Sequence, residues 1–227
     1  MSVGFRMSIN VTCTLIVYLV GIACQLGHLP WFVLPLTLLL VFSRWAFSIH
    51  SRLHAHTEYP WYEEMVFLLT SPFNVGLLEH KVIHAKHHAF IGTERDLERL
   101  FYDAHPLVAF CLCLGHPEIT FWRALPWMKI EALGKALVRG ALFGCLWLLG
   151  GTNFLFWYFL PMRLLWAVSQ FMFTWVLHHQ AQPRTINLVL PDWLTPLVGT
   201  VGMKEFASHA IHHAVKRSPV KVLAERS

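Results

Sequence analysis

The sequence contains few charged residues and many hydrophobic ones. Of its 227 residues, 14% are Asp, Glu, Lys or Arg, 56% are hydrophobic, and the mean hydropathy is +0.49. A soluble domain has about 25% charged residues, so the composition favours a single membrane-embedded unit. Internal repeats, low-complexity tracts and linkers are missing. No basic run with interleaved aromatic residues occurs, so nucleic acid is not expected as a partner.

Cysteine pairs of the kind that bind zinc are missing as well. The five cysteines lie in or beside apolar segments and are expected to be small buried hydrophobic residues. They are Cys13, Cys24, Cys111, Cys113 and Cys145. No glutamate is followed three residues later by a histidine, which is the ligand pattern of soluble di-iron bundles. We therefore expect neither a zinc finger nor a soluble di-iron bundle.

Apolar runs of membrane-spanning character are present instead, since about 20 helical residues cross a bilayer. Four transmembrane helices are predicted, at residues 11–27, about 30–54, about 137–150 and 154–177. The first is interpreted as a retained helix, because no small-residue cleavage site precedes Pro30. Aromatic and charged residues coexist in two stretches that are expected to be interfacial, residues 57–80 and 184–203. Residues 105–118 are too short to span and are expected to be re-entrant or on the surface.

The distribution of positive charge gives the orientation of these spans. If the N-terminus is cytoplasmic, the outer turns at residues 25–30 and 150–153 contain no Lys or Arg. All 18 Lys and Arg residues except Arg163 then fall on or near the cytoplasmic side, as the positive-inside rule requires. The prediction is a multi-pass integral membrane protein with both termini in the cytoplasm.

Arg163 follows Pro161, which is expected to kink the fourth helix. Arg163 is either a functional cation inside the membrane or, if that helix starts later, a residue near the outer face. The spacing alone does not choose between the two.

Fifteen histidines are the most informative feature of the chain. Three groups have helical spacing, since residues three and four apart share a helix face. His50 and His54 form the first group, and His80 and His84 lead into the second. Eight positions with this spacing, and one of the pair His178/His179, give nine candidate metal ligands. They are His50, His54, His84, His87, His88, His178, His209, His212 and His213.

A metal site explains these groups physically. Converging neutral imidazoles would need many hydrogen-bond partners, and charged ones would repel one another, whereas a metal takes one lone pair from each ring. Nine ligands exceed one four-coordinate zinc site, so two ions are expected. Zinc, iron and manganese all accept imidazole, and spacing does not choose among them. All the histidine groups fall on the cytoplasmic side, so a histidine-rich cytoplasmic cap is predicted.

The order of the groups resembles the membrane-bound fatty-acid desaturase and hydroxylase superfamily. His-x3-His is followed by His-x-x-His-His and by a late His-x-x-His-His. The stretch from His87 to Asp96 is similar to the second box of that family with its downstream acidic residue. Thr174-Trp-Val-Leu-His178 is similar to the end of its fourth helix, and His212-His213 to its closing box. The first box lacks the acidic residue that is frequent there, His56 is an alternative partner, and His80 is an additional histidine.

This resemblance implies two iron ions that use O2 to oxidise an unactivated C–H bond in a lipid or fatty-acyl chain. Desaturation is the expected reaction. Hydroxylation or keto formation on a fatty-acyl or carotenoid substrate is the alternative on the same scaffold. Because no flavin, haem or iron–sulfur motif is present, electrons are expected from an external ferredoxin- or cytochrome-type donor.

Two other classes of protein are weighed against this reading. Transporters place ionisable residues near the bilayer midplane, whereas these histidines lie at helix ends. A membrane zinc hydrolase would need only three protein ligands. We therefore expect an oxidoreductase, with a membrane metal-binding or transport protein as the alternative class.

Overall fold

A computed structural model describes residues 3–53, 77–127, 130–179, 189–207, 209 and 213. Over these residues the chain is helical and contains no strand, which confirms the all-α prediction. Several expectations fall outside the described residues. They concern His54, His56, His212 and most of the stretch at residues 57–80.

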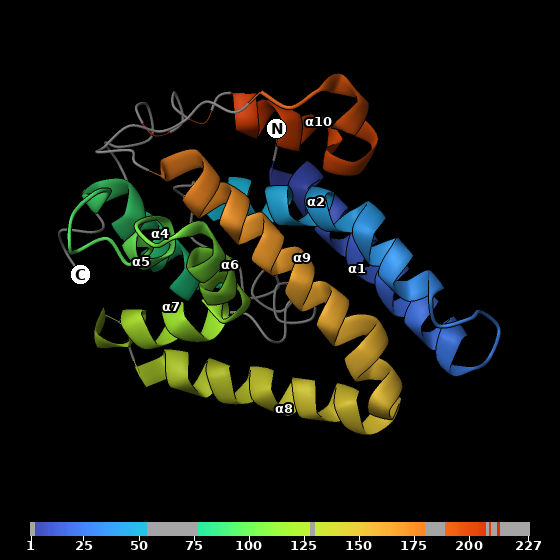
Figure 1. The fold of residues 1–227 in the computed structure, drawn as a ribbon. Coiled ribbons are helices and arrows are strands. Elements are labelled where there is room, and N and C mark those ends of the chain that lie inside the picture. Colours follow the sequence, from blue (N-terminus) through green and yellow to red (C-terminus); the bar gives the residue numbers. More distant parts are fainter. Residues whose placement is uncertain are drawn as a thin grey trace.

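The first two helices form a hairpin. α1 spans Val3–Gln25 and α2 spans Val33–Leu53, and they pack along their length (Figure 1). Gly27 lies in the turn between them with φ 77°, a conformation that glycine adopts at little cost. The turn sends the chain back, so that His50 lies at the far end of α2.

A second hairpin follows the central part of the chain. α8 spans Ile130–Phe154, η2 spans Leu155–Phe159, α9 spans Leu160–Phe171 and η3 spans Met172–Val176. The chain reverses at Gly151, with φ 54° and ψ −142°, and Figure 1 shows α8 and α9 as the two legs that meet there. A Cβ atom on Gly150 would lie 2.7 Å from the Cβ of Phe154. The glycine pair therefore permits the tight reversal.

The chain accommodates Pro161 with a wider turn. η2 is a π-helix, and the backbone N–H of Leu160 bonds to the carbonyl of Leu155, five residues earlier. Pro161 then stands in the first turn of α9, where its missing N–H is tolerated. The distortion that the sequence predicts around Pro161 is thus a π-helical turn.

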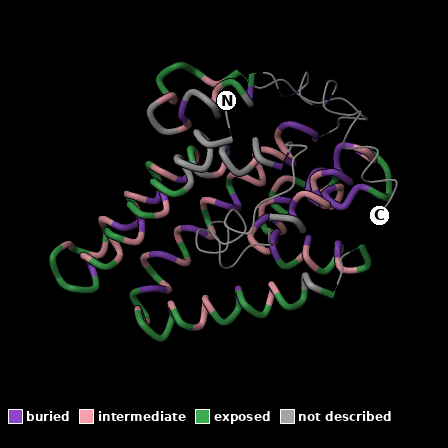
Figure 2. Tube along the Cα trace, turned by 180° about the vertical axis from the view of Figure 1, so that it is seen from behind, coloured by how far each residue is buried: buried purple, intermediate pink, exposed green. Residues whose placement is uncertain are grey.

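In the described part of the chain, one stretch is long and apolar enough to cross a membrane. It is Leu133–Val176, which includes the reversal at Gly151, while Val11–Gln25 and Val33–Arg44 are shorter apolar helices. Figure 2 shows exposed residues along the outer sides of these helices. Apolar residues among those exposed include Leu19 at 63%, Leu137 at 76% and Leu148 at 87%. The number of spans remains a prediction.

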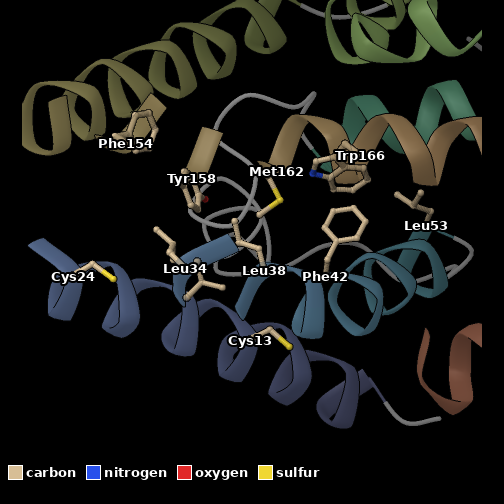
Figure 3. Close-up of a cluster of buried hydrophobic side chains, with 11 residues drawn as sticks. Cys13, Cys24, Leu34, Leu38, Phe42, Leu53, Phe154, Tyr158, Met162 and Trp166 are labelled. Atoms are coloured by element: carbon tan, nitrogen blue, oxygen red, sulfur yellow. The ribbon is translucent and has the colours of Figure 1, made fainter. Parts of the chain in front are cut away.

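The two hairpins pack against each other through a hydrophobic core. Leu38 of α2 and Met162 of α9 are completely buried in it, and Figure 3 shows the two rows of side chains that face one another. The rings of Phe42 and Trp166 meet edge to face, with centroids 5.2 Å apart. This core fixes α9 against α2, and so fixes the end of the fourth helix relative to His50.

Short helices form a cap at one end of the hairpins. They are α4 (Leu77–Phe90), α5 (Arg99–Tyr102), α6 (Pro106–Leu114), α7 (His116–Ala124), η1 (Leu125–Trp127), η4 (Asp192–Leu194) and α10 (Thr195–Ala207). The segment expected to be re-entrant or on the surface is α6, which packs on α9, and the start of α7. α10 packs on α2, where Phe206 contacts Phe47 with ring centroids 5.7 Å apart.

Arg163 lies at the start of α9 and forms an ion pair with Glu118 of α7. Its guanidinium also lies over the ring of Phe159, 5.5 Å from the centroid. The side chain of Arg163 is only 16% exposed, whereas that of Glu118 is 52% exposed. Arg163 therefore links the second hairpin to the cap.

Candidate metal centre

Histidines from four separate parts of the chain meet in the cap. α2 contributes His50, the end of the second hairpin contributes His178, and α4 contributes three more. His209 and His213 follow α10. Seven of the nine predicted ligands lie in the described residues, and all seven line one region. They are His50, His84, His87, His88, His178, His209 and His213.

One group of these side chains surrounds the Nε2 atom of His178. This atom lies 3.3 Å from Nε2 of His87, 3.1 Å from Nε2 of His213 and 3.3 Å from Nε2 of His209. Ligand nitrogens of His87, His178 and His213 all lie within 4.8 Å of one another. The first three residues are buried to at least 95%, and His209 is 3% exposed.

These separations fit a shared ion. Nitrogens about 2.1 Å from a metal lie roughly 3.0 Å apart at right-angled octahedral positions and roughly 3.4 Å apart on a tetrahedron. The observed Nε2 separations of 3.1–3.3 Å fall between these values. Without an ion or a proton, lone pairs at this distance face one another unfavourably.

A second group adjoins the first. The Nε2 atoms of His84 and His88 lie 3.1 Å apart, and the ring of His50 meets that of His84 with centroids 4.9 Å apart. His88 stacks on His213 at 4.1 Å, which joins the two groups. The donor set is therefore nitrogen-rich and divides into two neighbouring parts.

His178 and His179 have different surroundings. His178 belongs to the first group, and its Nδ1–H donates to the carbonyl oxygen of Thr174 at 3.1 Å. His179 instead stacks on Trp175 with centroids 4.1 Å apart, and its Nδ1–H donates to the carbonyl oxygen of Tyr102 at 3.2 Å. Thr174 lies in the π-helical turn η3, so this turn directs the Nε2 lone pair of His178 toward the other rings.

His87 is held by a buried carboxylate. Its Nδ1 lies 3.0 Å from Oδ2 of Asp96, and Asp96 is completely buried. The hydroxyl of Tyr102 donates to Oδ2 of Asp96 at 2.7 Å, and the backbone N–H of Glu98 donates to Oδ1 at 2.8 Å. A carboxylate on one nitrogen fixes the ring and makes the opposite nitrogen a better ligand.

Burial and charge set the protonation of the centre. Burial lowers the pKa of His178 to about 3 and lowers that of His213 further. Burial acts on His87 in the same sense, but the charges of Asp96 and Glu98 and the hydrogen bond to Asp96 outweigh it and raise its pKa to about 9. His178 and His213 are therefore neutral and ready to bind a cation.

Other titratable groups surround the centre. Burial raises the pKa of Glu98 to about 7 and lowers those of His80 and His116 to about 4 and about 3. The carboxylate of Glu98 lies 3.6 Å from Nδ1 of His87 and 3.9 Å from Nε2 of His116. His80 lines the same small cavity as His84 and Glu98.

The sequence analysis missed several of these outer partners. Asp96 was noted only as an acidic residue downstream of the second box, and Thr174 only as the start of the stretch that ends at His178. Glu98 and Tyr102 were not predicted to contribute. A signal existed for Glu98, since two acidic residues two positions apart follow a histidine cluster in a chain with only 13 acidic residues. No local pattern marks the roles of Tyr102 and Thr174.

Two cavities lie along the seam between the hairpins. The smaller, about 50 Å³, lies beside the histidines and is also lined by Trp166, Ser169 and Gln170 of α9. The larger, about 300 Å³, lies between α1, α2 and the turn at Gly151 and is mostly apolar. The two cavities share no lining residue, and Leu38 and Met162 of the buried core line neither of them.

Comparison with known proteins adds no family to this description, because no family model, curated protein or solved structure matches the chain.

Proposed function

We propose that this protein is a multi-pass membrane oxidoreductase that uses two iron ions and O2 to oxidise an unactivated C–H bond in a lipid or fatty-acyl chain, with desaturation as the expected reaction. One observation carries the proposal. Histidines from α2, from α4 and from the segments that follow η3 and α10 converge at one end of apolar helices, and most of them are buried. A nitrogen-rich donor set accepts iron. The order of the histidine groups resembles that of the membrane-bound fatty-acid desaturase and hydroxylase superfamily, and this resemblance supports iron over zinc.

The residues of the chain have defined tasks in this proposal. Iron would supply the redox chemistry with O2. Asp96 and the Thr174 carbonyl orient His87 and His178 so that each Nε2 faces the shared site. Burial of these rings excludes bulk water, which strengthens their electrostatic interactions. Trp166 and Phe173 line the small cavity beside these rings. An apolar substrate chain would pack against these two side chains.

The proposed electron source is another protein of ferredoxin or cytochrome type. The sequence contains no motif for a flavin, haem or iron–sulfur cluster. Hydroxylation or keto formation, including that of a carotenoid, would use the same centre and remains an outcome of the product analysis.

The proposed topology has four spans, formed by α1, α2, α8 and η2–α9–η3. Support comes from the two turns at Gly27 and Gly151, which contain no Lys or Arg. To test this topology, the native cysteines are removed and a single cysteine is placed at His28, Thr152 or Thr93, which are all exposed. Each variant is then treated with a membrane-impermeant thiol reagent. The first two should react in intact cells and Thr93→Cys only after permeabilisation. Equal reaction at all three positions in intact cells contradicts the topology.

Product analysis tests the reaction. Membrane lipids from cells with and without the wild-type chain are compared by mass spectrometry, beside His87→Ala and the control His28→Ala, which changes an exposed histidine. A new double bond, hydroxyl or ketone should occur with the wild type and with His28→Ala only. Metal analysis should find two iron ions per chain. A single zinc ion, with unchanged lipids, overturns the proposal.

A further inference from the structure

Tyr102 lies beside two histidines of the first group, one from α4 and one from the end of the second hairpin. It is only 2% exposed and ends the short helix α5. Its hydroxyl donates to Oδ2 of Asp96 at 2.7 Å and accepts the backbone N–H of Gly92 at 2.9 Å. Asp96 in turn holds Nδ1 of His87. The side chain of Tyr102 is thus tied to the ligand that α4 contributes.

The same residue is tied to the end of the second hairpin. The carbonyl oxygen of Tyr102 accepts Nδ1–H of His179 at 3.2 Å, and its ring lies 5.8 Å from that of His178. Two residues later, the carbonyl of Ala104 accepts the indole N–H of Trp175 at 3.0 Å. These contacts hold the start of the α5–α6 connection against the turn that delivers His178.

We propose that Tyr102 and His179 are positioning residues that set the separation of His87 and His178. Among the described residues, no backbone hydrogen bond joins the elements that carry these two ligands, yet their Nε2 atoms lie 3.3 Å apart. Tyr102 acts on His87 through Asp96, and His179 anchors Tyr102 by its backbone carbonyl. His179 therefore holds the geometry of the metal site, while His178 supplies the ligand. This inference rests on the proposed metal site and does not require lipid oxidation.

The test is binding of Co²⁺ alone, because its visible spectrum reports ligand geometry. Tyr102→Phe keeps the ring and removes the hydroxyl, so that Asp96 loses one donor and the Gly92 N–H loses its acceptor. Loss of an outer hydrogen-bond partner typically costs a metal site roughly 10- to 100-fold in affinity. We expect a loss of this size together with a shifted spectrum. Tyr158→Phe, which changes another buried tyrosine in the core away from the histidines, is the matched control and should match the wild type.

His179→Phe provides the second arm and does not depend on how Tyr102→Phe folds. Phenylalanine can still stack on Trp175 but cannot donate to the Tyr102 carbonyl. Co²⁺ stoichiometry should stay at the wild-type value, while the affinity falls and the spectrum shifts in the same sense as for Tyr102→Phe. Loss of an entire ion would make His179 a ligand and overturn the inference.

The outcomes separate the positioning role from the function. If the wild type binds Co²⁺ and both variants match it in affinity and spectrum, the positioning role is wrong and the oxidoreductase proposal stands. If the variants behave as expected but the wild type changes no lipid, the positioning role stands and the proposed reaction is wrong. A wild-type chain that takes up no Co²⁺ overturns both.

Discussion

His87 and His178 are separated by 91 positions in the chain, yet their Nε2 atoms lie 3.3 Å apart in the buried centre. Nδ1 of His87 is bonded to Asp96, and Nδ1 of His178 to a backbone carbonyl. Both rings therefore direct their Nε2 atoms toward the same point. Such an arrangement is what a metal ion requires of its ligands, and it supports the following predictions.

Replacing His178 should remove more metal than any change around it. His178→Ala removes the Nε2 atom that lies within 3.3 Å of the Nε2 atoms of three other histidines. We expect the affinity to fall by more than the roughly 10- to 100-fold that loss of an outer partner costs. Metal per purified chain, measured by elemental mass spectrometry beside His28→Ala, checks this. Wild-type metal content in His178→Ala would contradict the ligand assignment.

Metal uptake should release a proton from His87. In the metal-free protein the pKa of His87 is about 9, while those of His178 and His213 lie far below neutrality. Between pH 6.5 and about 9, only His87 of these three must therefore lose a proton when a metal binds. Affinity should rise with pH across this window, and His87 should release up to one proton per chain as the metal binds.

Asp96→Asn is the matched variant for this measurement. It removes the charge that raises the pKa of His87 but keeps a hydrogen-bonding oxygen, so His87 should be less protonated beforehand. Fewer protons should then be released, as measured with an indicator dye in weak buffer. Proton release equal to that of the wild type would show that Asp96 does not control His87.

Much of the fold follows from local patterns in the sequence. Apolar runs in the sequence predicted the helices of both hairpins, because the length and hydrophobicity of such a run can be read from neighbouring residues. The spacing of His84, His87 and His88 placed them on one face of a helix, as α4 confirms. The partners of these rings were harder to predict. Tyr102 and Thr174 act through a hydroxyl and a carbonyl whose positions depend on how α5 and the π-helical turn pack in three dimensions.

His179 illustrates the same limit. Adjacent histidines at the end of a helix are equivalent in sequence, and either one satisfied the predicted ligand count. Only tertiary packing separates them, since His179 lies against Trp175 and Tyr102. The choice between His178 and His179 depends on contacts with residues 71 to 77 positions away, which no local spacing records.

The seam between the hairpins should dominate stability. Leu38 is completely buried between α2 and α9, so Leu38→Ala leaves a cavity and should cost about 2–5 kcal/mol. Leu148→Ala changes a side chain that is 87% exposed and should cost no more than about 0.5 kcal/mol. Denaturant unfolding in detergent micelles compares the two. Equal effects of both substitutions would mean that the core of Figure 3 does not hold the hairpins together.

Arg163 should contribute to docking of the cap and not to metal binding. Its partner Glu118 is half exposed, and solvent screens such a pair, so a double-mutant cycle of Arg163→Gln and Glu118→Gln should give a coupling below about 1 kcal/mol. Metal content and lipid products should match the wild type in each variant, because neither residue contacts a proposed ligand in the described part of the chain. Loss of metal in Arg163→Gln but not in Glu118→Gln would instead favour the functional cation that the sequence left open. If both variants lose a similar amount of unfolding free energy and keep the metal content of the wild type, Arg163 serves the contact between α9 and α7.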